Sequence, residues 1–405
     1  MEGKNMRKKL LFISSKKIYP LTRGDRIRVF NNLKILSEQY DIDLLFLTNE
    51  KTCKEDLDEI KKYCNNIKEF RFHNIMYILN VVFGFLRNKK PLQVNYFYFK
   101  KVQKWIDKRI NEYDVVFCNH VRTTEYVKKY CYNITKVVDF VDAISMNYLT
   151  AQIGAKLLWK KIYKVESKRL INYEVEISKI FDRNIIISEA DKKHIVKHGG
   201  ENNFTVISNF VKDFDEVKVI SMDESSLSFI GAMNYEPNVS AMVYFCREVL
   251  PKLKQKKSGV KMDILGGFVS KEIERLNEID GVNVRGFVEK PEVIIKKSCL
   301  FVAPMISGAG VQNKILEAMK LGKCVITTKI GAQGLPNLEG NEIIIAEGKK
   351  DLINQILYYL DDDNKYKREE IGENARNYIL NYFSYEGVKQ QMLEALNVNN
   401  SRSAS

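Results

Sequence analysis

The 405-residue sequence has little of what a disulfide-bonded, zinc-binding or membrane-spanning protein needs. Its seven cysteines are odd in number and scattered, and no two stand at C-x-x-C spacing. We therefore expect neither a disulfide framework nor a zinc site, as fits a reducing cytosol. The longest apolar run, Ile75–Leu86, has twelve residues, whereas a membrane-spanning helix needs about twenty. The apolar run behind the basic first residues is too short for a signal peptide and predicts a strand.

Positive charge is concentrated in the first half of the sequence. The formal net charge is +14; residues 1–200 hold 39 Lys and Arg against 23 Asp and Glu, and residues 201–405 hold 26 against 28. This asymmetry suggests an anionic partner for the first half only, such as a membrane surface, a lipid phosphate or a nucleic acid. A merely lysine-rich soluble protein is the alternative, but it leaves the asymmetry unexplained.

Short β-branched runs alternate with longer amphipathic stretches along the chain. This alternation is typical of parallel sheets covered by helices on both faces, and the strands are too many for one comfortable sheet. We therefore predict an α/β protein with two doubly wound, Rossmann-like domains. Strands are expected at Lys9–Ser14, Ile42–Leu47, Ile67–Phe72, Asp114–Cys118, Lys136–Phe140, Asn184–Ile187, Thr205–Ile207, Leu227–Ile230, Lys261–Leu265, Val282–Arg285, Leu300–Ala303, Cys324–Thr327 and Glu342–Ile345.

The domain boundary is expected in the polar, weakly periodic stretch Ser208–Ser226, close to the change in charge. Residues 1–210 would form the first, acceptor-side domain, and residues 211–384 the second, donor-binding domain. The amphipathic run 385–397 is predicted to be a helix that returns to the first domain. The polar tail 398–405 is predicted to be disordered.

Ligands of open parallel sheets bind beyond the carboxyl ends of the strands, so the residues behind each strand are the candidates. After the first strand, "YPLTRGDRIR" combines Gly24 with Arg23, Arg26 and Arg28 at the start of a predicted helix. A glycine lets backbone N–H groups approach an anion, and the helix N-terminus adds positive potential. A lone glycine is equally typical of a plain strand-to-helix turn, so both interpretations stay open.

Two more strand ends of the first half carry polar side chains. His120, one of only four histidines, directly follows the strand at Asp114–Cys118, and a functional and a structural role are both open for it. Asp139 and Asp142 gather at the next strand end, where they could hold a sugar hydroxyl or a cation. A helix N-cap is an equally good interpretation of Asp142.

In the second half, glycines follow three successive strands: Gly231, then Gly266 with Gly267, then Gly286. Each alone is ordinary turn chemistry. Together they indicate room for a ligand lying along the sheet edge.

The most informative stretch is "SGAGVQNKILEAM", which follows the strand "LFVAP". Gly308 and Gly310 precede a predicted helix over Val311–Lys320, whose first N–H groups can bind an anion. Lys314 lies one turn in, where it can reach the same phosphate. Glu317, three residues further on, shares nearly the same helical face and can accept two hydrogen bonds from a ribose diol. A Lys–Glu surface pair is the alternative.

This stretch, together with "SFIGAMNYEPNVSAM", "DILGG" and "VRGFVEK" before it, resembles the donor site of glycosyltransferase family 4, in particular its bacterial capsular and exopolysaccharide branch. The resemblance covers nearly the whole chain and implies the GT-B fold, in which two Rossmann-like domains face each other across a cleft. It implies that Glu317 is the second glutamate of the family's E-x7-E motif, which binds the nucleotide ribose. The first glutamate of many members is replaced by Ala309, so backbone N–H groups of Gly310 and Val311 would take over its contact with the donor sugar.

The resemblance also implies roles for residues outside this stretch. "GAMNYEPNVSAM" lacks the family's paired basic residues, so Lys314 or a first-domain arginine would neutralise the diphosphate. Gly24 matches the family's glycine loop near the diphosphate, and His120 a histidine near the donor sugar. We accordingly assign catalytic roles to His120 and Lys314, and donor contacts to Gly24, Arg26, Gly231, Gly266, Phe287, Val288, Gly308, Ala309, Gly310, Val311, Gln312, Asn313 and Glu317.

The resemblance implies a retaining glycosyltransferase that moves a sugar from a nucleotide-diphosphate sugar to a saccharide or lipid-linked saccharide in polysaccharide biosynthesis. It implies no metal and no cofactor besides the substrate. A polyprenyl-diphosphate-linked acceptor at the inner face of the cytoplasmic membrane would explain both the basic first domain and the apolar run Ile75–Leu86. We therefore expect a cytoplasmic protein that associates peripherally with an anionic membrane surface.

Three other functions stay open on the sequence. A sugar-nucleotide epimerase of the same fold would need acid/base carboxylates in the cleft. A non-catalytic nucleotide-sugar-binding partner is compatible with Ala309. A nucleic-acid-binding module is favoured by charge alone and has no recognised motif, so we expect no nucleic-acid partner.

Overall fold

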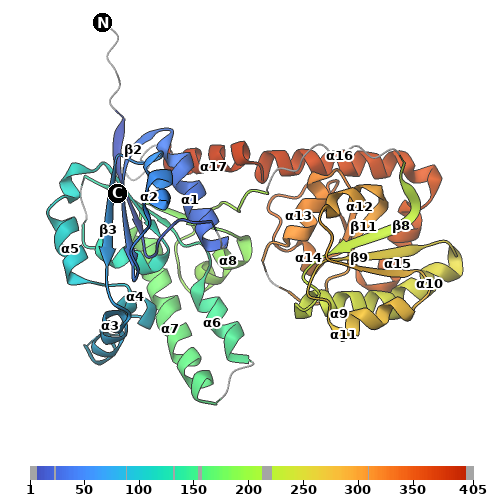
Figure 1. Cartoon of the computed structure of the whole chain (residues 1–405), viewed down its shortest axis with the longest axis horizontal. Coiled ribbons are helices and arrows are strands. Elements are labelled where there is room, and N and C mark those ends of the chain that lie inside the picture. The colour runs from blue at the N-terminus through green and yellow to red at the C-terminus, as the bar shows by residue number, and fades with distance from the viewer. Residues whose placement is uncertain are drawn as a thin grey trace, which may run out of the picture. The chain divides into compact units, whose positions relative to one another are not determined.

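The computed structural model describes residues 7–21, 24–87, 89–130, 133–153, 157–211, 221–308 and 310–397. The chain divides into two compact units, coloured mainly blue to green and yellow to red in Figure 1. Each unit contains one parallel sheet with helices, so the predicted α/β class with two doubly wound sheets is confirmed. Among the described helices, none combines the length and the apolar character that a membrane crossing requires. The first unit comprises Met1–Ile207 and Lys389–Ser405, and the second Ser208–Val388.

The first unit is built on seven parallel strands in the order β3-β2-β1-β4-β5-β6-β7. Its central strands read as nearly continuous apolar runs and are buried, as expected where helices cover both faces. The order reverses between β1 and β4, which pair directly. Such a switch point is where open α/β sheets bind ligands. The strands are β1 (Lys8–Ser14), β2 (Tyr40–Thr48), β3 (Asn66–Arg71), β4 (Val115–Asn119), β5 (Thr135–Asp139), β6 (Arg183–Ile186) and β7 (Phe204–Val206).

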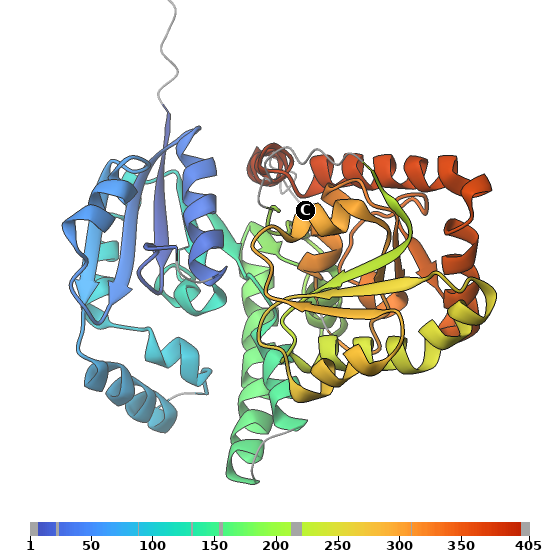
Figure 2. The same cartoon turned by 45° about the vertical axis from the view of Figure 1, so that its right-hand side comes forward.

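Helices surround this sheet, and two of them extend beyond it. α6 (Ile144–Ile153) and α7 (Leu157–Ile180) lie side by side as a hairpin (Figures 1 and 2). α3 (Asn74–Arg87) packs on α4 (Leu92–Tyr96). The remaining helices of the first unit are α1 (Gly24–Ser37), α2 (Lys54–Lys61), α5 (Lys100–Asp107), η1 (Ile110–Glu112), η2 (Val121–Tyr126) and α8 (Glu189–Lys197).

The second unit has six parallel strands in the order β10-β9-β8-β11-β12-β13, with its switch point between β8 and β11. Its strands are β8 (Asp223–Ile230), β9 (Lys261–Leu265), β10 (Val282–Gly286), β11 (Ser298–Ala303), β12 (Val325–Thr328) and β13 (Ile344–Ala346). Its helices are α9 (Glu236–Tyr244), η3 (Phe245–Val249), α10 (Leu250–Lys256), α11 (Lys271–Glu274), η4 (Arg275–Glu278), α12 (Pro291–Lys297), α13 (Asn313–Lys320), α14 (Lys329–Ala332), α15 (Gly348–Tyr359), η5 (Asp362–Asn364) and α16 (Lys365–Tyr382).

All thirteen predicted strands are present, with ends shifted by at most four residues. The largest shift is at β8, which begins at Asp223 instead of Leu227 because its polar first residues pair with the start of β11. The predicted last helix is confirmed as α17 (Tyr385–Asn397). Within the first unit, Lys389 of α17 forms an ion pair with Glu38, directly behind α1. The predicted tail 398–405 lies outside the described residues.

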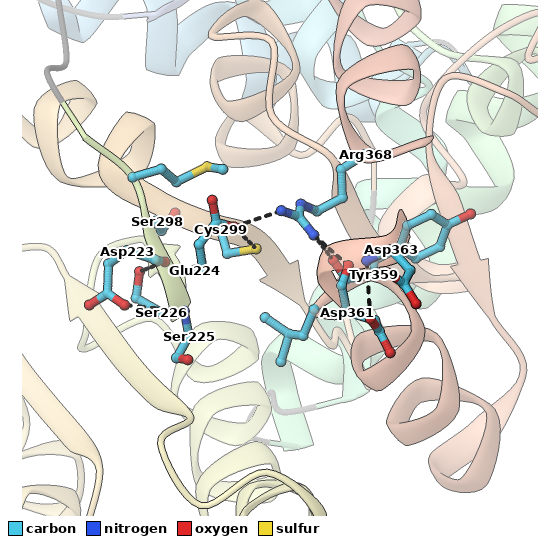
Figure 3. Close-up of polar contacts among 12 residues, drawn as sticks. Asp223, Glu224, Ser225, Ser226, Ser298, Cys299, Tyr359, Asp361, Asp363 and Arg368 are labelled. Carbon is cyan, nitrogen blue, oxygen red and sulfur yellow. Dashed lines mark hydrogen bonds and ion pairs between the residues drawn. The ribbon is translucent and has the colours of Figure 1, made fainter. Parts of the chain in front are cut away.

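A buried arginine ties the amino end of the second sheet to the last helices (Figure 3). Arg368 of α16 donates to the carbonyls of Tyr359 at 2.7 Å and Asp361 at 3.0 Å, and it pairs with Glu224 Oε2 at 2.6 Å. Cys299 Sγ also donates to Glu224, at 3.7 Å. A buried guanidinium is tolerated only where its donors are satisfied, so this network holds α16 against the sheet edge opposite to the candidate site.

Candidate functional site

The loop between β11 and α13 lies at the carboxyl edge of the second sheet, beside its switch point. Gly308 and Gly310 have φ of +130° and +69°, a conformation that other residues rarely adopt. Gln312 is still extended, with φ −92° and ψ 96°, so α13 begins at Asn313. The predicted helix start at Val311 is therefore wrong by two residues, because the loop straightens before the helix forms.

Neighbouring segments hold this loop in place. The side-chain amide of Gln333 donates to Gly308 O at 3.1 Å. Gly334 permits a close approach, since a Cβ there would lie 2.6 Å from Gly310 O. The start of α13 is therefore anchored to the segment behind β12. Position 309, where the sequence has Ala309, lies outside the described residues.

Lys314 and Glu317 are both half-buried on α13, unlike the exposed surface pair that was the alternative. Lys314 Nζ donates to Gln312 Oε1 at 2.7 Å and lies 5.6 Å from the centroid of the Phe229 ring. Burial lowers the pKa of Lys314 to about 8, and the charge of Glu317 partly opposes this shift. Burial raises the pKa of Glu317, and Lys314 partly offsets the rise. Perturbed charges of this kind are typical of binding and catalytic sites.

The other predicted donor contacts of this loop differ in exposure. Val311 is half-buried, Gln312 is buried and Asn313 is exposed at the first position of the helix. Within the described residues, the N-cap residue Gln312 makes no side-chain cap hydrogen bond to α13. The first N–H groups of the helix form its positive end and suit an anion.

The glycines behind β8 and β9 serve the packing of the sheet itself. A Cβ at Gly266 would lie 1.8 Å from Gly231 O, and a Cβ at Gly231 would lie 2.4 Å from Asn238 Nδ2. Gly231 and Gly266 therefore have a packing role. At Gly267 and Gly286 the nearest described neighbour of a Cβ lies 3.9 Å away, so the expected room for a ligand there is neither confirmed nor contradicted. A donor contact of their backbone stays a prediction.

Two aromatic side chains project at neighbouring strand ends of the second sheet. Phe287, behind β10, is 82% exposed, and Phe268, behind β9, is 79% exposed; Val288 is half-buried. Exposed aromatic faces can act as platforms on which nucleotide bases stack. Phe287 was expected from the family resemblance, and Phe268 was not. The position of Phe268, directly behind a strand and two glycines, is the signal that could have identified it.

In the first unit, a cationic pocket lies at the carboxyl ends of β1 and β4, at the switch point of that sheet. Gly24 and Arg26 lie in the first turn of α1 behind β1, and Arg26 reaches the pocket wall. No carboxylate is among the described residues that line it, although Lys17 pairs with Asp56 Oδ2 at 2.8 Å. The wall therefore carries net positive charge. Sequence reasoning missed three of its basic residues, which lie directly behind strand ends. The charged and aromatic lining residues are Lys16, Lys17, Arg26, His120 and Arg122.

His120 is held in an unusual backbone conformation behind β4, with φ 66° and ψ 144°. Its N–H donates to Asp139 O at 2.8 Å, and its carbonyl accepts from Thr123 Oγ1 at 2.9 Å. Its Nδ1 is buried and has no hydrogen-bond partner within the described structure. Burial, together with the charges of Arg122 and Lys16, lowers the pKa of His120 well below its ordinary value, so the ring is neutral at pH 7. Strain combined with an unsatisfied buried atom favours a functional role.

The acidic candidates of the first half have structural partners. Asp139 is fully buried and accepts from Arg28 Nε at 2.8 Å, from Arg28 Nη2 at 2.9 Å and from Asn32 Nδ2 at 2.8 Å. The carboxylate of Asp139 therefore has hydrogen-bond partners within the protein, which corrects its predicted role as a sugar or cation ligand. Because Arg28 is bound to Asp139, it is also a poor candidate for binding an anion. Asp142 accepts from Asn147 Nδ2 at 2.7 Å. It is not an N-cap, because α6 begins two residues later.

Comparison with known proteins shows what this chain is similar to. Residues 224–362 match the family model described as glycosyl transferases group 1. An uncharacterized 44.6 kDa protein in the cps region of Klebsiella pneumoniae is 25% identical over 393 residues, which cover 92% of this chain and 95% of that protein. Anabaena HepE in complex with UDP and glucose has a TM-score of 0.56 at 16% identity, over 96% of this chain and 100% of HepE. WaaG, a glycosyltransferase involved in lipopolysaccharide biosynthesis, has a TM-score of 0.55 at 13% identity, over 95% and 98%.

The segment matched by the family model contains α13, its preceding loop and the strand ends around them. At identities this low the two structural likenesses establish the fold, and it is the GT-B fold that the sequence predicts. The protein is therefore a glycosyltransferase of the GT-B type, with a group 1 glycosyltransferase domain at residues 224–362.

Proposed function

We propose that the protein transfers a sugar from a nucleotide-diphosphate sugar, bound at the start of α13, to a saccharide or lipid-linked saccharide. The observation that carries this proposal is the half-buried Lys314 and Glu317 on an uncapped helix inside the group 1 domain. A similar solved structure supports the donor class, because HepE was crystallised with UDP and glucose.

Each group at α13 has a task in this reaction. The helix N–H groups and the Lys314 ammonium stabilise the diphosphate as negative charge develops on the leaving group, by preorganised electrostatics. Glu317 accepts hydrogen bonds from the ribose diol. The exposed rings of Phe268 and Phe287 offer faces for the base. We propose that the transfer needs no metal ion, since the helix N–H groups and Lys314 neutralise the diphosphate.

For His120 in the first unit we propose a separate task. A neutral imidazole can exchange hydrogen bonds with a sugar hydroxyl, and its buried Nδ1 has no hydrogen-bond partner among the described residues. It cannot supply a proton as a general acid at pH 7, because its pKa is lowered. We assign the retaining outcome from the resemblance of the α13 motif to family 4.

The competing functions receive less support from the described residues. An epimerase needs acid/base carboxylates, and none lines the described wall of the His120 pocket. A non-catalytic binder would leave the strained His120 without a task. The relative in a cps region supports a role in capsular polysaccharide biosynthesis, and the basic first half supports association with the inner face of the cytoplasmic membrane.

A donor screen tests this function. The protein is incubated with UDP-, GDP- and other nucleotide sugars without acceptor, and released nucleotide is measured. We expect slow hydrolysis of one donor, lost in Glu317→Ala and kept in Glu278→Ala, an exposed glutamate before β10. The anomeric proton of the product, followed by NMR, tests retention. If no donor is bound or cleaved, or if Glu317→Ala cleaves it as fast as wild type, the proposal is wrong.

A further inference from the structure

α3 carries an apolar face that the described residues of the first unit leave uncovered. Tyr77 is buried, and Gly84 packs so closely on α4 that a Cβ there would lie 2.3 Å from Asn95 Cγ. Asn80 is tied to Tyr98 O at 2.8 Å. The rest of the helix is largely open to solvent, because eight large apolar side chains are 42–74% exposed: Ile75, Met76, Ile78, Leu79, Val82, Phe83, Phe85 and Leu86.

An apolar groove of 530 Å³ runs between α3 and α7 in the same unit. Its walls are mainly aliphatic and aromatic, and the charged residues Lys161, Glu166 and Arg169 also line it. The guanidinium of Arg169 lies 5.0 Å from the ring centroid of Phe85, and it pairs with buried Glu166 at 3.1 Å. The groove therefore has an apolar body and a charged end.

A larger basic cavity of 680 Å³ shares Val165 and Arg169 with this groove. Glu176 is the one carboxylate among its described lining residues, against six cationic side chains: Lys89, Lys90, Lys128, Lys164, Lys168 and Arg169. Lys90 pairs with Glu125, and Lys128 pairs with both Glu125 and Glu176. Lys164 and Lys168 are exposed on α7, so their charges are accessible to an anionic group that enters the cavity.

We propose that α3 and α7 form a membrane-docking site that holds one anionic lipid of the bilayer. The headgroup phosphate lies in the basic cavity, the hydrocarbon chain lies in the adjoining groove, and the exposed face of α3 enters the boundary between headgroups and acyl chains. An apolar body joined to a cationic end is complementary to an anionic amphiphile. A second copy of the chain is a poorer occupant, because a two-fold contact at this face would bring the same lysine-rich rim against itself.

This inference rests on the proposed function, since a lipid-linked acceptor would bind at the membrane surface. Its test measures membrane binding and not catalysis. The full chain is sedimented with vesicles of phosphatidylcholine alone or with 30% phosphatidylglycerol, a composition chosen for about 0.1 M salt, where surface charge still acts over about 10 Å. We expect binding to the anionic vesicles only, and its loss at 1 M salt.

Matched variants separate the site from net charge. Lys164→Glu/Lys168→Glu should weaken vesicle binding more than about tenfold, since each cation near an anionic surface adds about fivefold. Lys179→Glu/Lys193→Glu makes the same charge change at exposed lysines that do not line the cavity, and should bind nearly as wild type. Phe83→Ser/Leu86→Ser should also weaken binding, with folding checked by circular dichroism. As a gain of signal, Leu86→Trp fluorescence should be quenched by brominated lipid.

Several results would overturn the site. They are equal binding to neutral vesicles, equal losses in both lysine pairs, no quenching of Leu86→Trp, or a dimer in solution that Phe83→Ser/Leu86→Ser dissociates. The donor screen is read separately: variants that lose vesicle binding should still hydrolyse the nucleotide sugar. Failure of hydrolysis in wild type with intact vesicle binding would refute the proposed transfer and leave the lipid site standing.

Discussion

The lowered pKa of Lys314 makes donor affinity depend on pH in a range where an ordinary lysine would not titrate. In the free protein, burial lowers the pKa of this ammonium to about 8, whereas an unperturbed lysine titrates near 10.4. A bound diphosphate favours the charged form. Above pH 8 the free protein must therefore take up a proton to bind the nucleotide, and affinity falls as pH rises.

The magnitude follows from the fraction of protein that carries the ammonium. With a pKa of about 8, about nine-tenths is charged at pH 7 and about one-tenth at pH 9, so the dissociation constant should rise roughly tenfold between them. This corresponds to about 1.4 kcal/mol. The terminal phosphate contributes nothing over this range, because its last pKa lies near 6.

Isothermal calorimetry with the nucleoside diphosphate of the identified donor measures this directly at pH 7, 8 and 9. Buffers of different ionisation enthalpy should report uptake of close to one proton at pH 9 and little at pH 7. Lys314→Met should bind more weakly and show no such rise. Lys256→Met, at an exposed position at the end of α10, should behave as wild type. A flat wild-type profile, or a rise that persists in Lys314→Met, would refute the reasoning.

Three further predictions concern the same unit. Glu317→Ala should weaken nucleotide-sugar binding by about 1.5–3 kcal/mol, the loss typical of charged hydrogen bonds, and unchanged calorimetric affinity in a folded variant would contradict its ribose role. Ala309→Glu should be tolerated or change donor sugar preference. If the wild type transfers no sugar from any donor and Ala309→Glu does, the protein is a non-catalytic nucleotide-sugar binder and the proposed transfer is wrong. Arg368→Met should lower the free energy of unfolding by about 3 kcal/mol, because two carbonyls and Glu224 lose their donor; a urea midpoint equal to wild type would show that the network is dispensable.

The strands could be predicted from the sequence because their signal is local. A strand covered on both faces reads as a short, continuous apolar run bounded by polar residues, and every predicted strand is present. The placement of Lys314 and Glu317 on nearly the same face of one helix could also be predicted, since a spacing of three residues determines it. What the spacing could not reveal is that both side chains are half-buried and titrate abnormally, because burial depends on which segments pack around α13.

Long-range partners decided the rest. From the sequence, Asp139 could have bound a ligand. In the folded protein, Arg28, 111 positions away, donates two hydrogen bonds to its carboxylate. The missing side chain of Gly266 was expected to leave room for a ligand, but the carbonyl oxygen of Gly231 occupies that position in the folded protein. The run Ile75–Leu86 was compatible with a buried or an exposed helix, and only the packing of α3 left its apolar face open. Sequence patterns report the preferences of neighbouring residues, whereas burial, satisfaction of charge and free volume are properties of contacts between distant ones.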